Sequence, residues 1–229
     1  MKNKIKTIAI IGGGPAGCAL ATLLKRKGFK VAVFYLEKRP EIIVGESLVP
    51  AIIPMLRALG VEDEVKSYST YKPGASVWVS KDEEATSPFS YGGGNLPPYA
   101  YNVPRVKFDK TIFVFFLKEG VRFFNLAAKI EKTGNNDELK ISDDTIAGTY
   151  GYFDAQPDLI VDATGRSRTI SRLLNIPTKQ GYRKDVALFA HLSGAEKIEP
   201  YNIHLHRLEK GWNWRIPLPD RTSVGVVIN

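Results

Sequence analysis

Apolar residues in the first forty positions fall into two kinds of run. Residues 7–11 and residues 30–36 are short and almost entirely apolar, which is typical of strands buried on both faces. Between them, residues 15–27 carry apolar side chains at helical spacing. A strand, a helix and a second strand in this order predict a parallel sheet with a right-handed crossover.

Weaker patterns continue along the middle of the chain. Residues 48–59 have helical spacing, in which Pro50 fits the first turn and Pro54 is expected to kink the helix. Residues 109–118 favour a helix, although their apolar core would also suit a strand. We also expect a loop over residues 87–98, a turn at 134–137, a buried strand over 159–163 and a short helix over 168–174.

Apolar and polar residues alternate, as in half-buried strands, in two separate parts of the chain. These runs lie at residues 75–79, 186–192, 202–208, 212–216 and 223–228. We expect them to form one antiparallel, substrate-side sheet. The predicted fold class is therefore α/β, a doubly wound, Rossmann-like domain interleaved with an antiparallel β-sheet domain. The predicted limits assign residues 1–71 and 102–178 to the first domain, and residues 72–101 and 179–229 to the second.

Composition narrows the class of protein. Of the 229 residues, 44% are apolar and 24% are charged, as in ordinary soluble globular proteins. No apolar run approaches the roughly 18 residues that span a bilayer, and the first run is too short for a signal peptide. The single cysteine, Cys18, excludes an internal disulfide, so the predicted compartment is the cytoplasm. The net charge of +8 comes from scattered lysines, which favours solvated faces over nucleic-acid binding.

The strand–helix junction carries a dinucleotide fingerprint, Gly12-Gly-Gly-Pro-Ala-Gly17. Gly12 permits the tight turn, Gly14 lets the backbone approach a pyrophosphate, and Gly17 lets the helix pack closely on the strand. Glu37 follows the second strand, twenty residues after Gly17, at a spacing that suits a carboxylate binding ribose hydroxyls. Such a carboxylate disfavours NADP, but it does not separate FAD from NAD. The alternative is a glycine-rich turn without a nucleotide.

Four further segments carry a resemblance to a known family. They are Gly45-Glu-Ser-Leu-Val-Pro50, Val103-Pro-Arg105, Asp162-Ala-Thr-Gly165 and Trp212-Asn-Trp-Arg-Ile-Pro217. Together with the fingerprint, they resemble the flavin-dependent halogenases, a branch of the p-hydroxybenzoate hydroxylase-like flavoproteins with a GR2-type FAD domain. The spelling of the first segment is more similar to the phenol and pyrrole halogenases than to the tryptophan halogenases.

The resemblance implies a set of FAD-binding residues. These are Gly12, Gly14, Pro15, Ala16, Gly17, Glu37, Lys38, Gly45, Glu46, Ser47, Arg105, Asp162 and Gly165. Relatives continue into a third flavin segment built around Gly-Asp, and the 229 residues hold no counterpart of it. The resemblance therefore implies a chain truncated at its C-terminus.

The resemblance also implies a reaction and its partners. In the family, a separate flavin reductase supplies reduced FAD, which with O₂ and a halide ion yields hypohalous acid. Lys72, in Lys-Pro-Gly-Ala75, matches the lysine that transfers the halogen to a small electron-rich phenol or pyrrole, free or bound to a carrier protein. Trp212 and Trp214 would form a wall between the substrate and the flavin.

Other interpretations stay open at this point. The scaffold also suits a flavin monooxygenase, a geranylgeranyl-reductase-like enzyme or an inactive flavin-binding remnant. Lys72 could be a solvated loop residue, and the two tryptophans could be core aromatics on alternate faces of a strand. The rival catalytic set is the three histidines, His191, His204 and His206. His204 and His206 share a strand face, as metal ligands sometimes do, but no third acidic or Cys ligand has suitable spacing, so we predict no metal. Cys18 is expected to be a packing residue.

Overall fold

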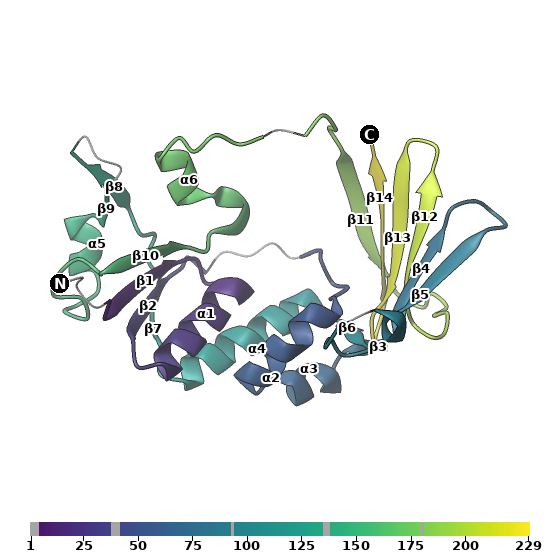
Figure 1. Cartoon of the computed structure of the whole chain (residues 1–229), viewed down its shortest axis with the longest axis horizontal. Helices are drawn as coiled ribbons and strands as arrows, with labels where there is room; N and C mark the ends of the chain where they lie inside the picture. Colours follow the sequence, from purple (N-terminus) through teal and green to yellow (C-terminus); the bar gives the residue numbers. More distant parts are fainter. Residues whose placement is uncertain (1–4, 38–41, 93, 135–137, 180) are drawn as a thin grey trace. The chain divides into compact units, whose positions relative to one another are not determined.

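The computed structural model describes residues 5–37, 42–92, 94–134, 138–179 and 181–229 (Figure 1). The chain divides into two compact units, which we describe separately. The first unit comprises residues 1–40 and 109–179, and the second comprises residues 41–108 and 180–229. Residues 41–71 thus belong to the second unit, whereas the predicted limits place them with the nucleotide-binding segment; those functional domain limits stay a prediction.

The first unit is built on a four-stranded parallel sheet. Its strand order is β10-β1-β2-β7, and all three neighbouring pairs run parallel. The helix α1 (Pro15–Arg26) joins the two central strands, so the predicted strand–helix–strand opening is confirmed. The strands are β1 (Thr7–Ile11), β2 (Lys30–Phe34), β7 (Arg122–Phe124) and β10 (Leu159–Asp162).

The two faces of this sheet are covered by different elements. Ala9, Ile11 and Phe34 point to one face and form a buried cluster with Ile141 and Phe153. The elements β8 (Ile130–Thr133), β9 (Glu138–Ile141) and α5 (Asp143–Ala147) lie on that side. On α1 the buried residues include Cys18, which is 1% exposed, as expected of a packing residue.

The strand β10 is less buried than its sequence predicts. It is apolar enough to be covered on both faces, yet Leu159 is 40% exposed because β10 is an edge strand with only β1 beside it. A 3₁₀ turn, η3 (Gly165–Ser167), follows it and leads into the short helix α6 (Thr169–Leu173), near the predicted position. Among the described residues, no helix is both long and apolar enough to cross a membrane.

The second unit contains a six-stranded sheet with the order β11-β14-β13-β12-β4-β5. Strands from the two alternating parts of the sequence thus share one sheet, as expected. One junction differs from the expected antiparallel arrangement, because β12 and β4 pair in parallel. The strands are β4 (Gly74–Trp78), β5 (Glu84–Pro88), β11 (Val186–Leu192), β12 (Ile203–Leu208), β13 (Gly211–Pro217) and β14 (Thr222–Ile228).

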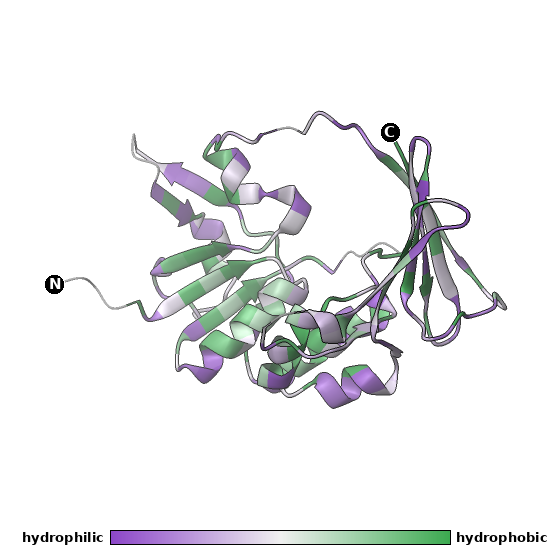
Figure 2. Ribbon diagram, turned by 45° about the vertical axis from the view of Figure 1, so that its right-hand side comes forward, coloured by the Kyte–Doolittle hydropathy of each residue, from purple (hydrophilic) through white to green (hydrophobic). Residues whose placement is uncertain are grey.

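Hydropathy colouring separates the two sheets (Figure 2). The strands β1 and β2 are predominantly hydrophobic, since helices and hairpins cover both of their faces. The strands of the six-stranded sheet mix hydrophobic and hydrophilic residues, which is the pattern from which they were predicted.

The segment over residues 48–59 differs from its prediction. Leu48 and Val49 are extended, a 3₁₀ turn η1 (Pro50–Ile52) follows, and α2 (Ile53–Leu59) begins only then. Pro54 lies in the first turn of α2, where its missing N–H removes no helical hydrogen bond. The expected kink is therefore absent, because the helix starts at this proline instead of passing through it. The helix α3 (Glu62–Ser67) was not predicted from the sequence.

Several other helices, strands and loops also begin or end at residues that differ from the predicted ones. The expected loop over residues 87–98 begins inside β5 and includes the 3₁₀ turn η2 (Phe89–Tyr91). The ambiguous segment over residues 109–118 is helical, within α4 (Arg105–Lys118). Two short strands, β3 (Thr70–Lys72) and β6 (Ala100–Asn102), pair antiparallel in the second unit. The turn between β8 and β9 includes Gly134, and the rest of it, residues 135–137, lies outside the described residues.

Candidate functional site

Backbone packing leaves no room for a side chain at the first and last glycines of the loop, and the Tyr35 side chain leaves none at Gly13. Gly12 has a φ of +117°, and a Cβ there would collide with the carbonyl oxygen of Ala163. A Cβ on Gly17 would collide with the carbonyl oxygen of Gly12. The backbones of Gly12, Gly17 and Ala163 are therefore packed too closely to admit a side chain at either glycine. This agrees with the roles predicted for the first and last glycines.

Gly14 has a different environment. Its backbone is extended, and a Cβ there would meet no atom within 4 Å. Gly14 is the N-cap of α1, no side chain among the described residues caps the helix, and Pro15 occupies the first turn. The N–H groups of the first turn, including those of Ala16 and Gly17, thus face a space without a side-chain partner. This arrangement fits the pyrophosphate of a dinucleotide such as FAD, which binds at free helix N-termini.

The acidic partner of the loop is only partly described. Glu37 is exposed just after β2, and its backbone N–H donates to Asn125 Oδ1 over 3.3 Å. Lys38 lies outside the described residues. A role for these two residues in binding a ribose stays a prediction.

Asp162 organises the loop that packs against Gly12. Its Oδ1 accepts hydrogen bonds from the N–H and Oγ1 of Thr164 at 2.9 and 2.6 Å, and its Oδ2 accepts one from Ile170 N–H at 2.8 Å. Burial alone would raise the pKa of Asp162, but these bonds outweigh burial and hold the pKa below its ordinary value. The carboxylate is thus engaged within the chain. Gly165, with a φ of +59°, completes the turn.

In the second unit, the predicted residues Glu46 and Ser47, with Leu48, lie beside β6 and pair with it over a short stretch. Ser47 bridges to Asn102, Val103 N–H donates to the Glu46 carbonyl over 2.7 Å, and Leu48 N–H donates to the Tyr101 carbonyl over 3.0 Å. With β3 paired on the other side, β6 lies between β3 and this segment.

Arg105 fixes the start of this segment. Its Nη1 donates to the carbonyl of Val44 at 2.7 Å and to that of Gly45 at 3.3 Å. Gly45 has a φ of +92°, which turns its carbonyl toward the arginine without a steric penalty. The structure therefore brings Arg105 to the Gly45 segment, whereas contact of either with a flavin stays a prediction.

Lys72 is buried within the same group. It is 2% exposed, and its Nζ donates to Ser47 Oγ at 2.7 Å and to the Leu48 carbonyl. The ammonium also lies 5.1 Å from the centroid of the Phe89 ring. Burial lowers the pKa of Lys72 to about 8, because the charged form loses its contact with water. The alternative of a solvated loop lysine is therefore wrong.

A second buried group in this segment has a partner that the sequence did not reveal. Glu46 is 1% exposed, and its Oε1 lies 2.8 Å from Nε2 of His191 on β11. The two residues are 145 positions apart, and no local pattern connects them. From the sequence, His191 is a candidate only as a member of the rival histidine set.

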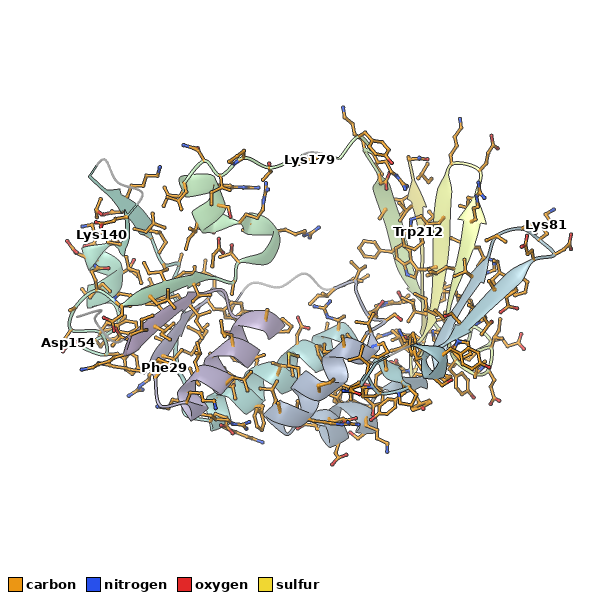
Figure 3. All side chains as sticks on the ribbon, viewed as in Figure 1. Phe29, Lys81, Lys140, Asp154, Lys179 and Trp212 are labelled. Carbon is orange, nitrogen blue, oxygen red and sulfur yellow. The ribbon has the colours of Figure 1, made fainter. Side chains whose placement is uncertain are left out.

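The two tryptophans lie on one face of β13, not on alternate faces. Side chains alternate with a period of two, so positions 212 and 214 share a face, and their ring centroids are 5.6 Å apart. Gly225, opposite Trp214, leaves room for the indole, since a Cβ there would collide with the ring. Trp214 also lines a hollow of about 590 Å³ on this sheet, with Leu188, His206 and Arg215. Trp212 is 37% exposed, and its side chain is labelled in Figure 3.

The other two histidines have separate environments. His206 stacks on Trp78, with ring centroids 5.6 Å apart and an interplanar angle of 7°. His204 is 6% exposed, and burial lowers its pKa. Within the described part of the chain, no three His, Cys, Asp or Glu side chains are grouped as metal ligands would be.

Comparisons with known proteins agree with the geometry. A family model described as Tryptophan halogenase matches residues 7–98 and 94–229. The flavin-dependent halogenase armH3 of Armillaria mellea is 32% identical over 237 residues, which cover 96% of this chain and 46% of the relative. The 1H-pyrrole-2-carbonyl-(peptidyl-carrier protein) chlorinase of Pseudomonas fluorescens is 26% identical over 250 residues, covering 96% of this chain and 55% of the relative.

A solved structure gives the same result for the fold. The crystal structure of a flavoprotein/dehydrogenase from Cytophaga hutchinsonii has a TM-score of 0.79 and 29% sequence identity, and the match covers 97% of this chain and 56% of that chain. The present chain thus spans about half the length of the proteins that it matches.

Proposed function

The chain belongs to the tryptophan halogenase family of flavin-dependent enzymes, and we propose that it carries the FAD-binding loop and the halogen-transferring lysine of a halogenase. The reaction consumes reduced FAD, O₂ and a halide ion, and it halogenates an electron-rich phenol or pyrrole. A separate flavin reductase delivers the reduced cofactor. The similarity to the pyrrole chlorinase supports a substrate bound to a carrier protein as one option.

The observation that carries this proposal is the buried Lys72. An ammonium group loses several kcal/mol of hydration when it is buried, so a lysine in a closed site is seldom there for stability. With a pKa of about 8, about a tenth of the amine is neutral at pH 7. The site therefore holds both a hydrogen-bond donor and a nucleophile.

Each protonation state of Lys72 has a task in halogen transfer. Bound reduced FAD supplies the chemistry that turns O₂ and halide into hypohalous acid. The protonated form of Lys72 donates a hydrogen bond to the oxygen of that acid. The neutral form attacks the halogen, so that an N–halogen bond forms, the O–halogen bond breaks and water leaves. The aromatic substrate then takes the halogen and its ring proton is lost, which regenerates the amine.

The remaining predicted residues bind FAD or separate the substrate from it. Gly12–Gly17, the loop at Asp162 and Glu37 would hold the adenosine diphosphate part of FAD. Trp212 and Trp214 form a packed aromatic pair, which suits a wall that keeps the substrate from direct oxygen transfer. A hydroxylase would lack that separation, and the mass of the product formed with and without halide distinguishes the two activities.

The test is Lys72→Ala in the intact protein. We expect reduced flavin to be reoxidised as in the parent, while halogenated product falls by roughly a hundredfold or more, the scale for losing a positioned catalytic group. Lys72→Arg should not restore product, because a guanidinium keeps the charge but is a poor nucleophile. The matched control is Lys81→Ala, an exposed lysine after β4 (Figure 3). Halogenation by Lys72→Ala at the parent rate would contradict the proposed role of Lys72.

A further inference from the structure

The Glu46 carboxylate is among the most thoroughly buried charged groups described in the second unit. At 1% exposure it needs a partner, since an unpaired buried carboxylate costs several kcal/mol. Nε2 of His191, 2.8 Å away, is that partner. His191 belongs to β11, one of the two edge strands of the six-stranded sheet. The contact therefore ties the Gly45–Leu48 segment to a strand far away in the sequence.

The next residue of the segment binds Lys72. Because side chains alternate along an extended strand, Glu46 and Ser47 point to opposite sides. Ser47 Oγ and the Leu48 carbonyl accept the hydrogen bonds of the Lys72 ammonium. Two consecutive residues thus hold two different side chains, His191 on one side and Lys72 on the other.

The amine of Lys72 is held by a strand that is not its neighbour. Lys72 on β3 pairs with Ala100 on β6, and the Gly45–Leu48 segment lies on the far side of β6. The lysine side chain therefore reaches past β6 to Ser47 Oγ. The position of the amine therefore depends on the position of the segment.

We infer that His191, acting through Glu46, is a positioning residue for the Lys72 amine. Without its donor, the Glu46 carboxylate has to leave its buried place to find water. The segment then moves, and Ser47 Oγ and the Leu48 carbonyl withdraw from Lys72. The inference deepens the proposed function, because it matters for catalysis only if Lys72 transfers the halogen, but the placement of the amine can be measured without any turnover.

Two substitutions of His191, by Gln and by Asn, place the same amide donor at different distances from Glu46. The amide nitrogen of Gln stands close to the position of His Nε2, whereas that of Asn is one methylene shorter and stands near Nδ1. His191→Gln therefore keeps a donor for Glu46, and His191→Asn loses it while remaining polar. Glu46→Gln keeps an acceptor for His191 but removes the charge.

The readout is the reactivity of individual amines in the 229-residue chain. Trace acetic anhydride labels lysines at a series of pH values, and peptide mass spectrometry compares Lys72 with the exposed Lys81 in the same sample. In His191→Asn, we expect Lys72 to be acetylated roughly fivefold faster, which is the scale for one lost hydrogen bond. We also expect the pH midpoint of its acetylation to lie closer to that of ordinary lysines. In His191→Gln and Glu46→Gln, the labelling of Lys72 should match the parent.

The possible outcomes decide the inference. Parent-like labelling of Lys72 in His191→Asn would overturn it, and so would an equal change in the Asn and Gln variants, which would indicate general loosening. A changed midpoint in Glu46→Gln alone would assign the effect to charge and also overturn it. If Lys72→Ala keeps halogenating, the proposed function fails, while the labelling result still decides whether His191 positions the amine.

Discussion

The glycine loop of the first unit and the lysine group of the second unit are constructed in different ways. In the loop, Gly12, Gly14 and Gly17 lie within six consecutive positions, and their function depends on the backbone. The lysine group takes Lys72 from β3, Glu46 and Ser47 from the segment beside β6, and His191 from β11. The loop needs an absence of side chains, whereas the lysine group needs specific side chains from distant segments.

The difference determines how each site would respond to change. The loop has no side-chain chemistry to lose, so its weakness is steric. The lysine group holds the buried Lys72 ammonium, whose pKa is lowered by burial, so its weakness is electrostatic and depends on pH. The following predictions test this contrast, beginning with the largest effect.

The largest effect is expected from Gly12→Ala. A φ of +117° costs an alanine about 1–3 kcal/mol, and the collision with the Ala163 carbonyl adds a similar amount. We expect a loss of about 4 kcal/mol in the free energy of unfolding. Gly14→Ala is the matched control, because its Cβ would meet nothing within 4 Å, and its cost should stay below about 1 kcal/mol. Urea denaturation measures both, and equal losses would show that the loop is not sterically constrained.

The loop was predictable because its requirements are local. A turn, a close backbone contact and a helix N-terminus all depend on residues a few positions apart, so glycine spacing alone reveals them. The same holds for the parallel sheet, the half-buried strands and most of the helices. Pro54 was misassigned because its effect depends on where α2 begins, and the starting residue of a helix is set by packing as well as by pattern.

The lysine group was predicted only in part. The resemblance to a known family drew attention to Lys72, Glu46 and Ser47, but no sequence pattern shows that Ser47 accepts a bond from Lys72 or that His191 meets Glu46. Those contacts follow from the order of strands in the sheets, which fixes which of several distant segments become neighbours. The shared face of Trp212 and Trp214, by contrast, follows from the period of a strand and was available from the sequence.

The second prediction uses the pH dependence of stability. The pKa of Lys72 is about 8 in the folded chain and near its ordinary value of 10.5 in the unfolded chain. Between these values the unfolded state binds more protons, so the stability of the parent rises with pH. Relative to Lys72→Met, which does not titrate, the parent should gain roughly 3 kcal/mol between pH 7 and pH 10.5.

Urea denaturation of both proteins at several pH values measures this difference. The comparison removes the contributions of other titrating groups, because they are common to the two chains. A difference that stays constant across the interval would mean that Lys72 is solvated in the folded chain. The glycine loop has no such group at Gly12, Gly14 or Gly17, so Gly14→Ala should show no pH-dependent difference from the parent.

The smallest effect is expected at Glu37, which lies outside the glycine loop and is predicted to add a side-chain contact to the same dinucleotide site. Its carboxylate is exposed after β2, at the spacing that suits the ribose hydroxyls of a bound dinucleotide. Glu37→Ala should weaken FAD binding by the intact protein roughly tenfold, which is about 1.4 kcal/mol and the scale of a hydrogen bond to a charged group. Asp154→Ala is the control, because Asp154 is an exposed carboxylate of the same unit (Figure 3). Flavin fluorescence titration measures both affinities. Equal affinities in the parent and Glu37→Ala would show that Glu37 does not contribute to FAD binding. The dinucleotide site would then depend on backbone groups alone, whereas the lysine group depends on side chains.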